Sequence, residues 1–246
     1  MCACDKNMRP VTKKIWQTIA LVGSISLFTV AVALTGTVIF QKTYFTPFWV
    51  NGQSMYPTLN KNAKYSNGTP IGERRIPGNV DGDYDVDYGF MDTHQTAINK
   101  ISRFKIVIFR AREDIISYNI KRVIALPGET FYITSSTDLN ENGKLYVKNP
   151  NSGLFEFIEQ PVDQDFVKNG AYTEEYTVPT TLGENEYFVM GDNRIGENSL
   201  DSRKTGPINK SLILGVAVGL NGVCTLANTQ DNIVPINIKH YWPRWL

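Results

Sequence analysis

The residues with the clearest chemical potential are a serine, a lysine and a polar cluster, which lie far apart in the chain. Ser54 follows apolar, strand-like residues and stands shortly before Pro57. Lys121 lies in a mostly apolar, β-favouring run from Tyr118 to Glu129. A third stretch, 187–203, continues an apolar segment with Gly-Asp-Asn-Arg and then Asn-Ser-Leu-Asp-Ser-Arg. Taken alone, the first stretch reads as a loop serine before a type I turn, because proline presets the first central φ of such turns.

A serine hydroxyl is a weak nucleophile until a base accepts its proton. Histidine is the usual base, but neither His94 nor His240 has a local sequence that suggests this role. A lysine can serve only if its amine is neutral near physiological pH, and burial in apolar surroundings lowers a lysine pKa. Lys121 has such neighbours in sequence. A strand lysine that points to solvent is nevertheless more common, so the residues alone leave the role of Lys121 open.

The three stretches together resemble the signature boxes of type I signal peptidases of the Gram-positive-like kind. These are membrane-bound serine–lysine proteases that remove signal peptides. The resemblance runs in order from about Phe48 to about Ile208, with gaps. It implies that Ser54 is the acyl-forming nucleophile and that Lys121 is its general base.

The resemblance also implies roles for the groups around this pair. Ser199 matches a serine that orients the lysine amine, and Asp201 and Arg203 match a structural acid–arginine pair. The Ser54 backbone N–H is expected to form one side of an oxyanion hole. Gly52 stands where some members carry a serine as the second donor, which leaves that donor unassigned. The positions that match the groove for small residues at −1 and −3 of the substrate are Val50, Met55 and Ile120.

Three stretches depart from the family pattern. The usual Arg-Gly-Asp before an apolar strand is here Arg103-Phe104-Lys105. Extra residues, 195–197, separate the Gly-Asp-Asn-Arg box from the following Asn-Ser. The polar segment 60–87 is longer than the family leads one to expect. None of these departures removes a proposed catalytic group.

The N-terminal region predicts a membrane anchor. Four basic residues precede the uncharged run from Ile15 to Phe40, which is long enough as a helix to cross a hydrocarbon core of roughly 30 Å. A cleavable signal peptide is the alternative, because Ala31-Val32-Ala33 resembles a cleavage site, but the apolar run continues beyond it. The positive-inside rule predicts a cytoplasmic tail (1–14), a transmembrane anchor (15–40) and an extracytoplasmic peptidase domain (41–246) in the cell membrane.

The rest of the chain predicts a mainly β fold, an antiparallel catalytic sheet with a small cap insertion at about 135–181. Apolar runs at 105–109, 122–126 and 187–190 read as buried strands. Two further runs, 130–133 and 144–147, flank Asn142-Gly143, a pair typical of a type I′ hairpin turn. The apolar stretch from Leu212 to Leu226 is too short for a second span and predicts a buried strand pair.

Composition also bears on which partners and metal ions the protein could bind. The net charge of +1 and the scattered basic residues argue against nucleic acid as a partner. Three cysteines and two histidines lack zinc or disulfide spacing. Alternating aspartates at 81–87 invite a calcium site, but the glycine and glutamate of an EF-hand loop are missing. We therefore expect no metal and no cofactor, with exported preproteins and the phospholipid membrane as partners.

The sequence leaves two competing functions open. One is a penicillin-binding protein, because the motifs S-x-x-K, S-x-N and K-T-G occur in that order at Ser102-Arg103-Phe104-Lys105, Ser117-Tyr118-Asn119 and Lys204-Thr205-Gly206. That family opens a helix at its first motif, where this sequence favours a strand. A dedicated or catalytically inactive relative that serves as a pilus or secretion assembly factor is the other alternative. Inactive relatives lose the nucleophile or the base, and this chain keeps both.

Overall fold

A computed structural model describes residues 10–63, 84–111, 118–228 and 233–246 of the 246-residue chain. The chain divides into two compact units, residues 1–44 and 45–246, and each is described by itself. Most of the polar segment 60–87, including Asp81 and Asp83 of the calcium hypothesis, lies outside the described residues, and so does Ser117.

The described part of the first unit, from residue 10 on, is one long helix, α1 (Pro10–Tyr44). It begins at a proline, which suits the first turn because its missing N–H would have no partner there. Large apolar side chains along it are exposed, with Leu27 at 73% and Phe28 at 70%. The stretch Lys14–Val38 has a mean hydropathy of 2.1 and is long and apolar enough to cross a membrane. The predicted N-terminal apolar helix is therefore confirmed, and it extends beyond both predicted ends.

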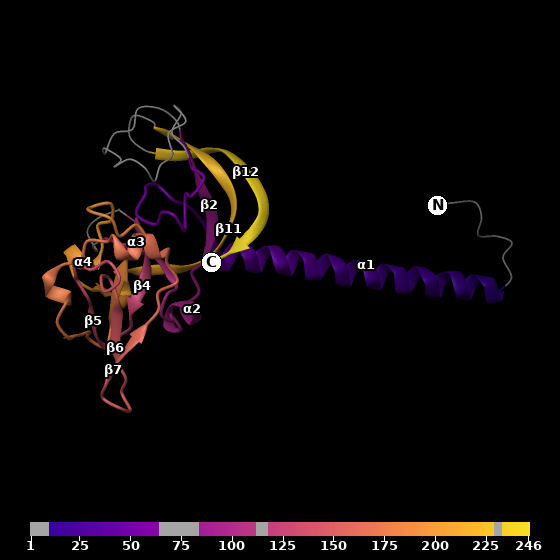
Figure 1. The fold of residues 1–246 in the computed structure, drawn as a ribbon. Helices are drawn as coiled ribbons and strands as arrows, with labels where there is room; N and C mark the ends of the chain where they lie inside the picture. Colours follow the sequence, from indigo (N-terminus) through magenta and orange to yellow (C-terminus); the bar gives the residue numbers. More distant parts are fainter. Residues whose placement is uncertain (1–9, 64–83, 112–117, 229–232) are drawn as a thin grey trace. The chain divides into compact units, whose positions relative to one another are not determined.

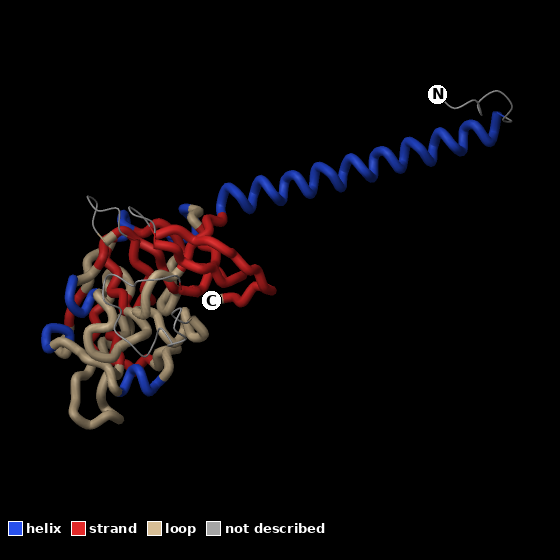
Figure 2. Tube along the Cα trace, turned by 90° about the horizontal axis from the view of Figure 1, so that it is seen from above, coloured by secondary structure: helices blue, strands red, loops and turns tan. Residues whose placement is uncertain are grey.

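In its described residues, the second unit is built on an antiparallel sheet of eight strands. Figure 1 shows that the long strands β2, β11 and β12 of this unit run together, and Figure 2 shows strands connected by extensive loops. The mainly β fold is as predicted. The strands, in sheet order with β12 paired to β11, are β1 (Phe45–Trp49), β2 (Tyr84–Asp92), β11 (Ile213–Asn228), β3 (Ile106–Arg110), β4 (Tyr118–Ala125), β9 (Glu186–Met190), β10 (Ile208–Asn209) and β12 (Ile233–Trp245).

A second, four-stranded sheet takes three of its strands from the segment expected to be a cap. Its β5 and β6 pair as expected, but the type I′ turn is wrong, because only Gly143 of the Asn142–Gly143 pair has a positive φ. The buried Asn142 amide instead donates to the backbone oxygens of Lys168 and Gly170, which holds the loop closed. The strands in order are β7 (Phe155–Ile158), β6 (Leu145–Lys148), β5 (Thr130–Ile133) and β8 (Thr180–Thr181).

The strand pair expected at 212–226 is a single strand, β11. Register shifts in its ladders let it pair with β3 near its start and with β2 and β12 further along. The helical segments are short. Within the described residues of this unit they are α2 (Gln95–Asn99), α3 (Gln164–Lys168), α4 (Ser202–Thr205), η2 (Glu174–Tyr176) and η3 (Lys210–Leu212).

Lys121, the candidate base, lies on β4, which pairs with β3 on one side and β9 on the other. Val107 of β3 lies opposite Lys121 of β4, and Val123 lies opposite Val189 of β9. These three valines are buried in one apolar cluster, and burial of each contributes roughly 1.5–3 kcal/mol. Lys121 therefore lies in an inner strand that packing on both sides holds in place.

Candidate active site

Ser54 lies in a loop that leaves β1 and is closed by one asparagine. The Asn60 amide donates to the backbone oxygens of Val50 (2.7 Å) and Gly52 (2.8 Å). Asn60 and Asp87 also exchange backbone-to-side-chain hydrogen bonds of 2.7 and 2.8 Å, which tie the loop to β2. Asn60 is fully buried and has a φ of 61°, a conformation that asparagine tolerates better than most residues. The loop geometry thus rests on a residue that sequence reasoning did not select.

Within this loop, Ser54 occupies a turn in which the Tyr56 N–H donates to the Gln53 oxygen at 3.0 Å. Gly52 immediately precedes the turn with a φ of 121°, a conformation that side chains rarely adopt. A serine at this position would be strained in this backbone. The glycine therefore has a conformational reason to stand where some family members carry a hydroxyl.

Lys121 reaches Ser54 across a sequence separation of 67 residues. Its Nζ lies 2.8 Å from Ser54 Oγ and donates a second hydrogen bond of 2.9 Å to the backbone oxygen of Ile120. Only 3% of Lys121 is exposed. Burial lowers the pKa of its amine from 10.5 to about 8, although the charge of Asp201 opposes part of this shift. An amine with this pKa can lose its proton near neutral pH.

Asp201 and Arg203 form a buried ion pair behind the site. Two hydrogen bonds, each of 2.9 Å, join the guanidinium to the carboxylate. The carboxylate also accepts from backbone N–H groups, that of Gly191 at 2.8 Å and that of Arg203 at the start of α4. Burial alone would raise the pKa of Asp201, but Arg203 and the neighbouring donors hold it below its ordinary value. The pair therefore fastens α4 to the end of β9.

Ser199 lies beside the same glycine and is buried. A Cβ built on Gly191 would come within 2.3 Å of both Ser199 Oγ and the Ser54 backbone oxygen, so only glycine fits between them. Among the described residues the Ser199 hydroxyl has no hydrogen-bond partner of good geometry, although it lies near enough to the Asp201 carboxylate to help lower that pKa. The structure therefore places Ser199 at the site without the predicted hydrogen bond to Lys121.

The three predicted groove residues occupy different environments. Val50 is 2% exposed and Met55 is fully buried, both in a cluster with strand residues of the main sheet. Ile120 is half-buried and packs at the edge of this cluster. In this conformation Ile120 alone of the three presents appreciable surface, and the groove assignment stays a prediction.

Arg122 and Asp192 form a second buried ion pair that sequence reasoning missed. The Arg122 guanidinium donates to the two carboxylate oxygens of Asp192 at 2.8 and 2.6 Å, and its third hydrogen bond reaches the Phe104 oxygen. Phe104 has a φ of 70°, a conformation that glycine takes at little cost. The glycine of the family's Arg-Gly-Asp pattern would take this conformation without strain. In this chain Phe104 stands at that position and bears the strain. The position of Arg122 directly after the lysine was the clue that could have pointed to this pair.

The extra residues at 195–197 form a loop that returns the chain to the site. Gly196 has a φ of 53°, and the Asn198 N–H donates to the Ile195 oxygen at 3.3 Å. The Asn198 side chain then meets Gln53 and Asn193, next to Ser54. The departure from the family pattern is therefore absorbed without moving the polar groups away from the serine.

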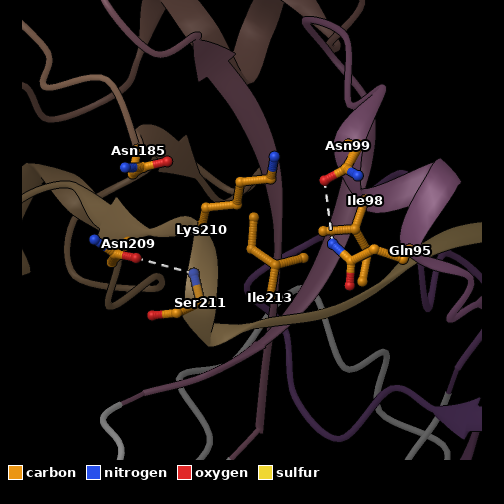
Figure 3. A pocket seen from close by; sticks show the side chains of 8 residues that line it. All are labelled: Gln95, Ile98, Asn99, Asn185, Asn209, Lys210, Ser211 and Ile213. Carbon is orange, nitrogen blue, oxygen red and sulfur yellow. Dashed lines mark hydrogen bonds between the residues drawn. The ribbon is translucent and has the colours of Figure 1, made fainter.

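The two histidines have contacts elsewhere. The His94 side chain accepts the Thr96 N–H at the start of α2, and His240 lies against the ring of Tyr88. The penicillin-binding alternative fails structurally, because the residues from Ser102 to Lys105 lead into β3 and form no helix. A hollow of about 440 Å³ lies between α2 and η3 (Figure 3). It is lined by Lys210, by four amide side chains and by Ser211, Ile98 and Ile213, and it contains none of the predicted site residues.

A half-buried serine lies beside a buried lysine of lowered pKa, on a β-sheet unit that follows an apolar helix in the chain. The chain belongs to the family described as signal peptidase, peptidase S26, whose model matches residues 21–220. Members of the signal peptidase I branch are membrane-anchored proteases, and Gram-positive enzymes are among the relatives of this chain.

Three similar proteins illustrate the relationship. Signal peptidase I of Bacillus amyloliquefaciens is 28% identical over 87% of this chain and 88% of its own length. Signal peptidase I T of Bacillus subtilis strain 168 is 29% identical over 76% of this chain and 79% of its own length. A solved structure of a signal peptidase I from Enterococcus faecalis V583 is 28% identical in sequence, with a TM-score of 0.34. The match covers 48% of this chain and 96% of the chain in that structure.

Proposed function

We propose that this protein removes N-terminal signal peptides from exported preproteins, with Ser54 as nucleophile and Lys121 as general base. The observation that carries the proposal is the 2.8 Å contact between Lys121 Nζ and Ser54 Oγ, made by an amine that is almost fully buried. Family membership supports signal peptide removal as the reaction.

The chemistry follows from the two groups. The neutral Lys121 amine accepts the hydroxyl proton as Ser54 Oγ attacks the scissile carbonyl, and the Ser54 N–H stabilises the oxyanion that develops. The ammonium then gives the proton to the leaving amine, which leaves an acyl group on Ser54. Water, deprotonated by Lys121, hydrolyses this acyl-enzyme.

Ser199 has a place in this cycle. A neutral amine has two N–H groups and one lone pair, and the lone pair must face Ser54 for proton transfer. One N–H already has the Ile120 oxygen as acceptor. The buried Ser199 hydroxyl, which lacks another partner of good geometry among the described residues, can accept the second one. Loss of this hydroxyl should slow cleavage less than loss of Ser54 or Lys121.

The proposed setting is the outer face of the cell membrane. The basic residues before α1 favour a cytoplasmic N-terminus, with α1 crossing the phospholipid bilayer and the β-sheet unit outside. There the unit would meet exported preproteins whose signal peptides enter the same bilayer. The substrate would bind as an extended segment, and small side chains would occupy the −1 and −3 positions near Val50, Met55 and Ile120.

The dyad is tested with the full-length protein in detergent and a preprotein that ends its signal peptide in Ala-x-Ala. Ser54→Ala removes the nucleophile and Lys121→Met removes the base, so each should abolish cleavage. Lys121→Arg should also abolish it, because a guanidinium stays protonated and cannot accept the serine proton. The double Ser54→Ala, Lys121→Met variant should lose no more than either single variant. Lys210→Ala, a lysine in the hollow of Figure 3, is the matched control and should cleave normally.

Substantial turnover by Lys121→Arg would refute lysine as the base. A folded but inactive His240→Ala or His94→Ala would redirect the search to histidine. The substrate assignment is tested separately: Phe or Leu at −1 should block cleavage, and equal cleavage of such a preprotein would contradict a groove built for small residues.

A further inference from the structure

Three amide side chains form a closed chain of hydrogen bonds next to Ser54. The Gln53 amide donates to Asn198 Oδ1 at 3.0 Å, and the Asn198 amide donates to Asn193 Oδ1 at 3.4 Å. The Asn193 amide then donates back to the backbone oxygen of Gln53 at 3.3 Å. We call Gln53, Asn193 and Asn198 the amide clasp.

The clasp holds the peptide group that carries the Ser54 N–H. The Gln53 oxygen accepts from Asn193 Nδ2 and also from the Tyr56 N–H at 3.0 Å. A second bond, from the Asn193 N–H to the Ser54 oxygen at 3.0 Å, fixes the following peptide group. Both carbonyl groups that flank the serine are therefore tied to the same asparagine.

Because the peptide group between Gln53 and Ser54 is planar, fixing its carbonyl also fixes the direction of the Ser54 N–H. The carbonyl and the N–H of one trans peptide unit lie in a single rigid plane and point in opposite directions within it, and the Gln53–Ser54 bond is trans. A carbonyl held at the Asn193 side therefore turns the Ser54 N–H away from the clasp. That N–H has no hydrogen-bond partner among the described residues, so it is available to a ligand.

We propose that the amide clasp aims the Ser54 N–H at the oxyanion of the tetrahedral intermediate, so that its three members are positioning residues for the acyl transfer. This inference rests on the proposed function. Gln53 and Asn193 are 7% and 1% exposed, so water does not compete strongly for their hydrogen bonds. The loop 195–197 contributes by returning Asn198 to this network.

If the amide clasp only positions the oxyanion donor, substituting its residues should weaken binding of the transition state and leave binding of the substrate unchanged. A whole oxyanion donor is worth about 100- to 1000-fold in kcat, and a misaimed donor should lose part of that, so Gln53→Met should lower kcat about tenfold. KM should not change, because the ground-state carbonyl gains little from this donor. The pH at which activity reaches half its maximum should also stay the same, since Lys121 is untouched.

The experiment compares kinetics with two probes of the site. A peptide aldehyde that ends in alanine accepts Ser54 Oγ–H across its carbonyl and forms a hemiacetal whose oxygen sits in the oxyanion hole. A preprotein with proline at +1 reports ground-state binding. Gln53→Met and Asn198→Ala should weaken aldehyde inhibition by the same factor that kcat falls and leave binding of the proline preprotein unchanged.

Gln160→Met is the matched control, because Gln160 is 5% exposed and its amide donates one hydrogen bond, of 2.8 Å, to the Gly143 oxygen outside the clasp. It should lose stability without losing kcat. The inference is overturned if Gln53→Met and Asn198→Ala keep the kcat and aldehyde affinity of the original protein, or if KM alone rises. Two variants are used so that, if one misfolds, the other still tests the inference. Turnover by Ser54→Ala would instead overturn the proposed function, and the two failures are thus distinguishable.

Discussion

Burial makes the charged form of Lys121 unfavourable, and the proposed role of this residue as a base depends on that effect. A free lysine is almost entirely protonated near pH 7. With a pKa of about 8, about a tenth of the Lys121 amine is neutral there. The residue can therefore act as a base without a histidine nearby.

The rate of cleavage should rise with pH and level off above about pH 8. In the proposed mechanism the neutral amine is the active form, so kcat/KM should follow its loss of a proton with an apparent pKa near the lowered value of about 8. Initial rates with one preprotein across a pH series measure this. A profile that is still rising at the pKa of free lysine, 10.5, would contradict a buried base.

Lys121→Met should be inactive and yet more stable near neutral pH. Below about pH 8 the folded protein holds a buried charge, and its removal should stabilise the fold by about 2 kcal/mol after the lost hydrogen bonds are counted. Denaturant unfolding of both proteins in detergent measures the difference.

The pH dependence of that difference supplies the control. Between about 8 and 10.5 the unfolded lysine keeps a proton that the folded one has lost, so the original protein gains stability as pH rises. The advantage of Lys121→Met should shrink across this window. Other titrating groups are common to both proteins and cancel, so a constant or growing advantage would mean that the pKa is not lowered.

Single residues could be nominated from the sequence only where a motif marked them. Ser54, Lys121, Ser199 and the Asp201–Arg203 pair do converge at one site. Asn60 and the amide clasp were not found, because their importance lies in contacts across many residues of sequence. The Gln53–Asn198 bond, for example, spans a separation of 145 residues, and no local rule predicts it.

At the level of elements, the end of β9 decides how closely the site can be assembled. Gly191→Ala would put a methyl group within 2.3 Å of the Ser54 oxygen and of Ser199 Oγ. Such a collision should cost about 1–3 kcal/mol of stability and, by displacing the serine, about 100-fold or more in kcat. Unfolding curves and initial rates measure the two effects.

Gly183→Ala provides the comparison for this variant. A Cβ at Gly183 would meet only the flexible side chain of Glu186, with a nearest contact of 3.1 Å. It should retain nearly full activity. If Gly191→Ala were as active as Gly183→Ala, close approach at β9 would not govern the position of the nucleophile.

Strands were predictable because their apolar runs are short and rich in β-branched residues. The runs at 105–109, 122–126 and 187–190 correspond to β3, β4 and β9. The predicted ends differ by one residue or less for β3 and β9, while β4 begins earlier than its run. The turn at Asn142–Gly143 and the continuity of β11 were not predictable in this way. In the first case a buried side chain overrides turn preference, and in the second the pairing partners are remote in sequence.

For the whole molecule, the arrangement across the membrane is the remaining prediction. A protease added outside intact protoplasts should degrade residues after Gln41 and spare the basic tail, because positive charge is retained on the cytoplasmic side. Tags at either end, read by immunoblot, distinguish the two outcomes. Protection of the C-terminal tag until the protoplasts are lysed would reverse the orientation and separate the enzyme from exported precursors.

The hydrogen bonds from Asn193 to the loop of Ser54 have a consequence for biogenesis. Translation supplies the serine early and its framework late: Lys121 follows after 67 residues, and the clasp and the Asp201–Arg203 pair come later still. A nascent chain that has not reached residue 203 therefore holds a serine without a fixed backbone frame. Proteolytic activity should appear only when nearly the whole β-sheet unit has emerged and folded, so the growing polypeptide is protected from its own incomplete active site.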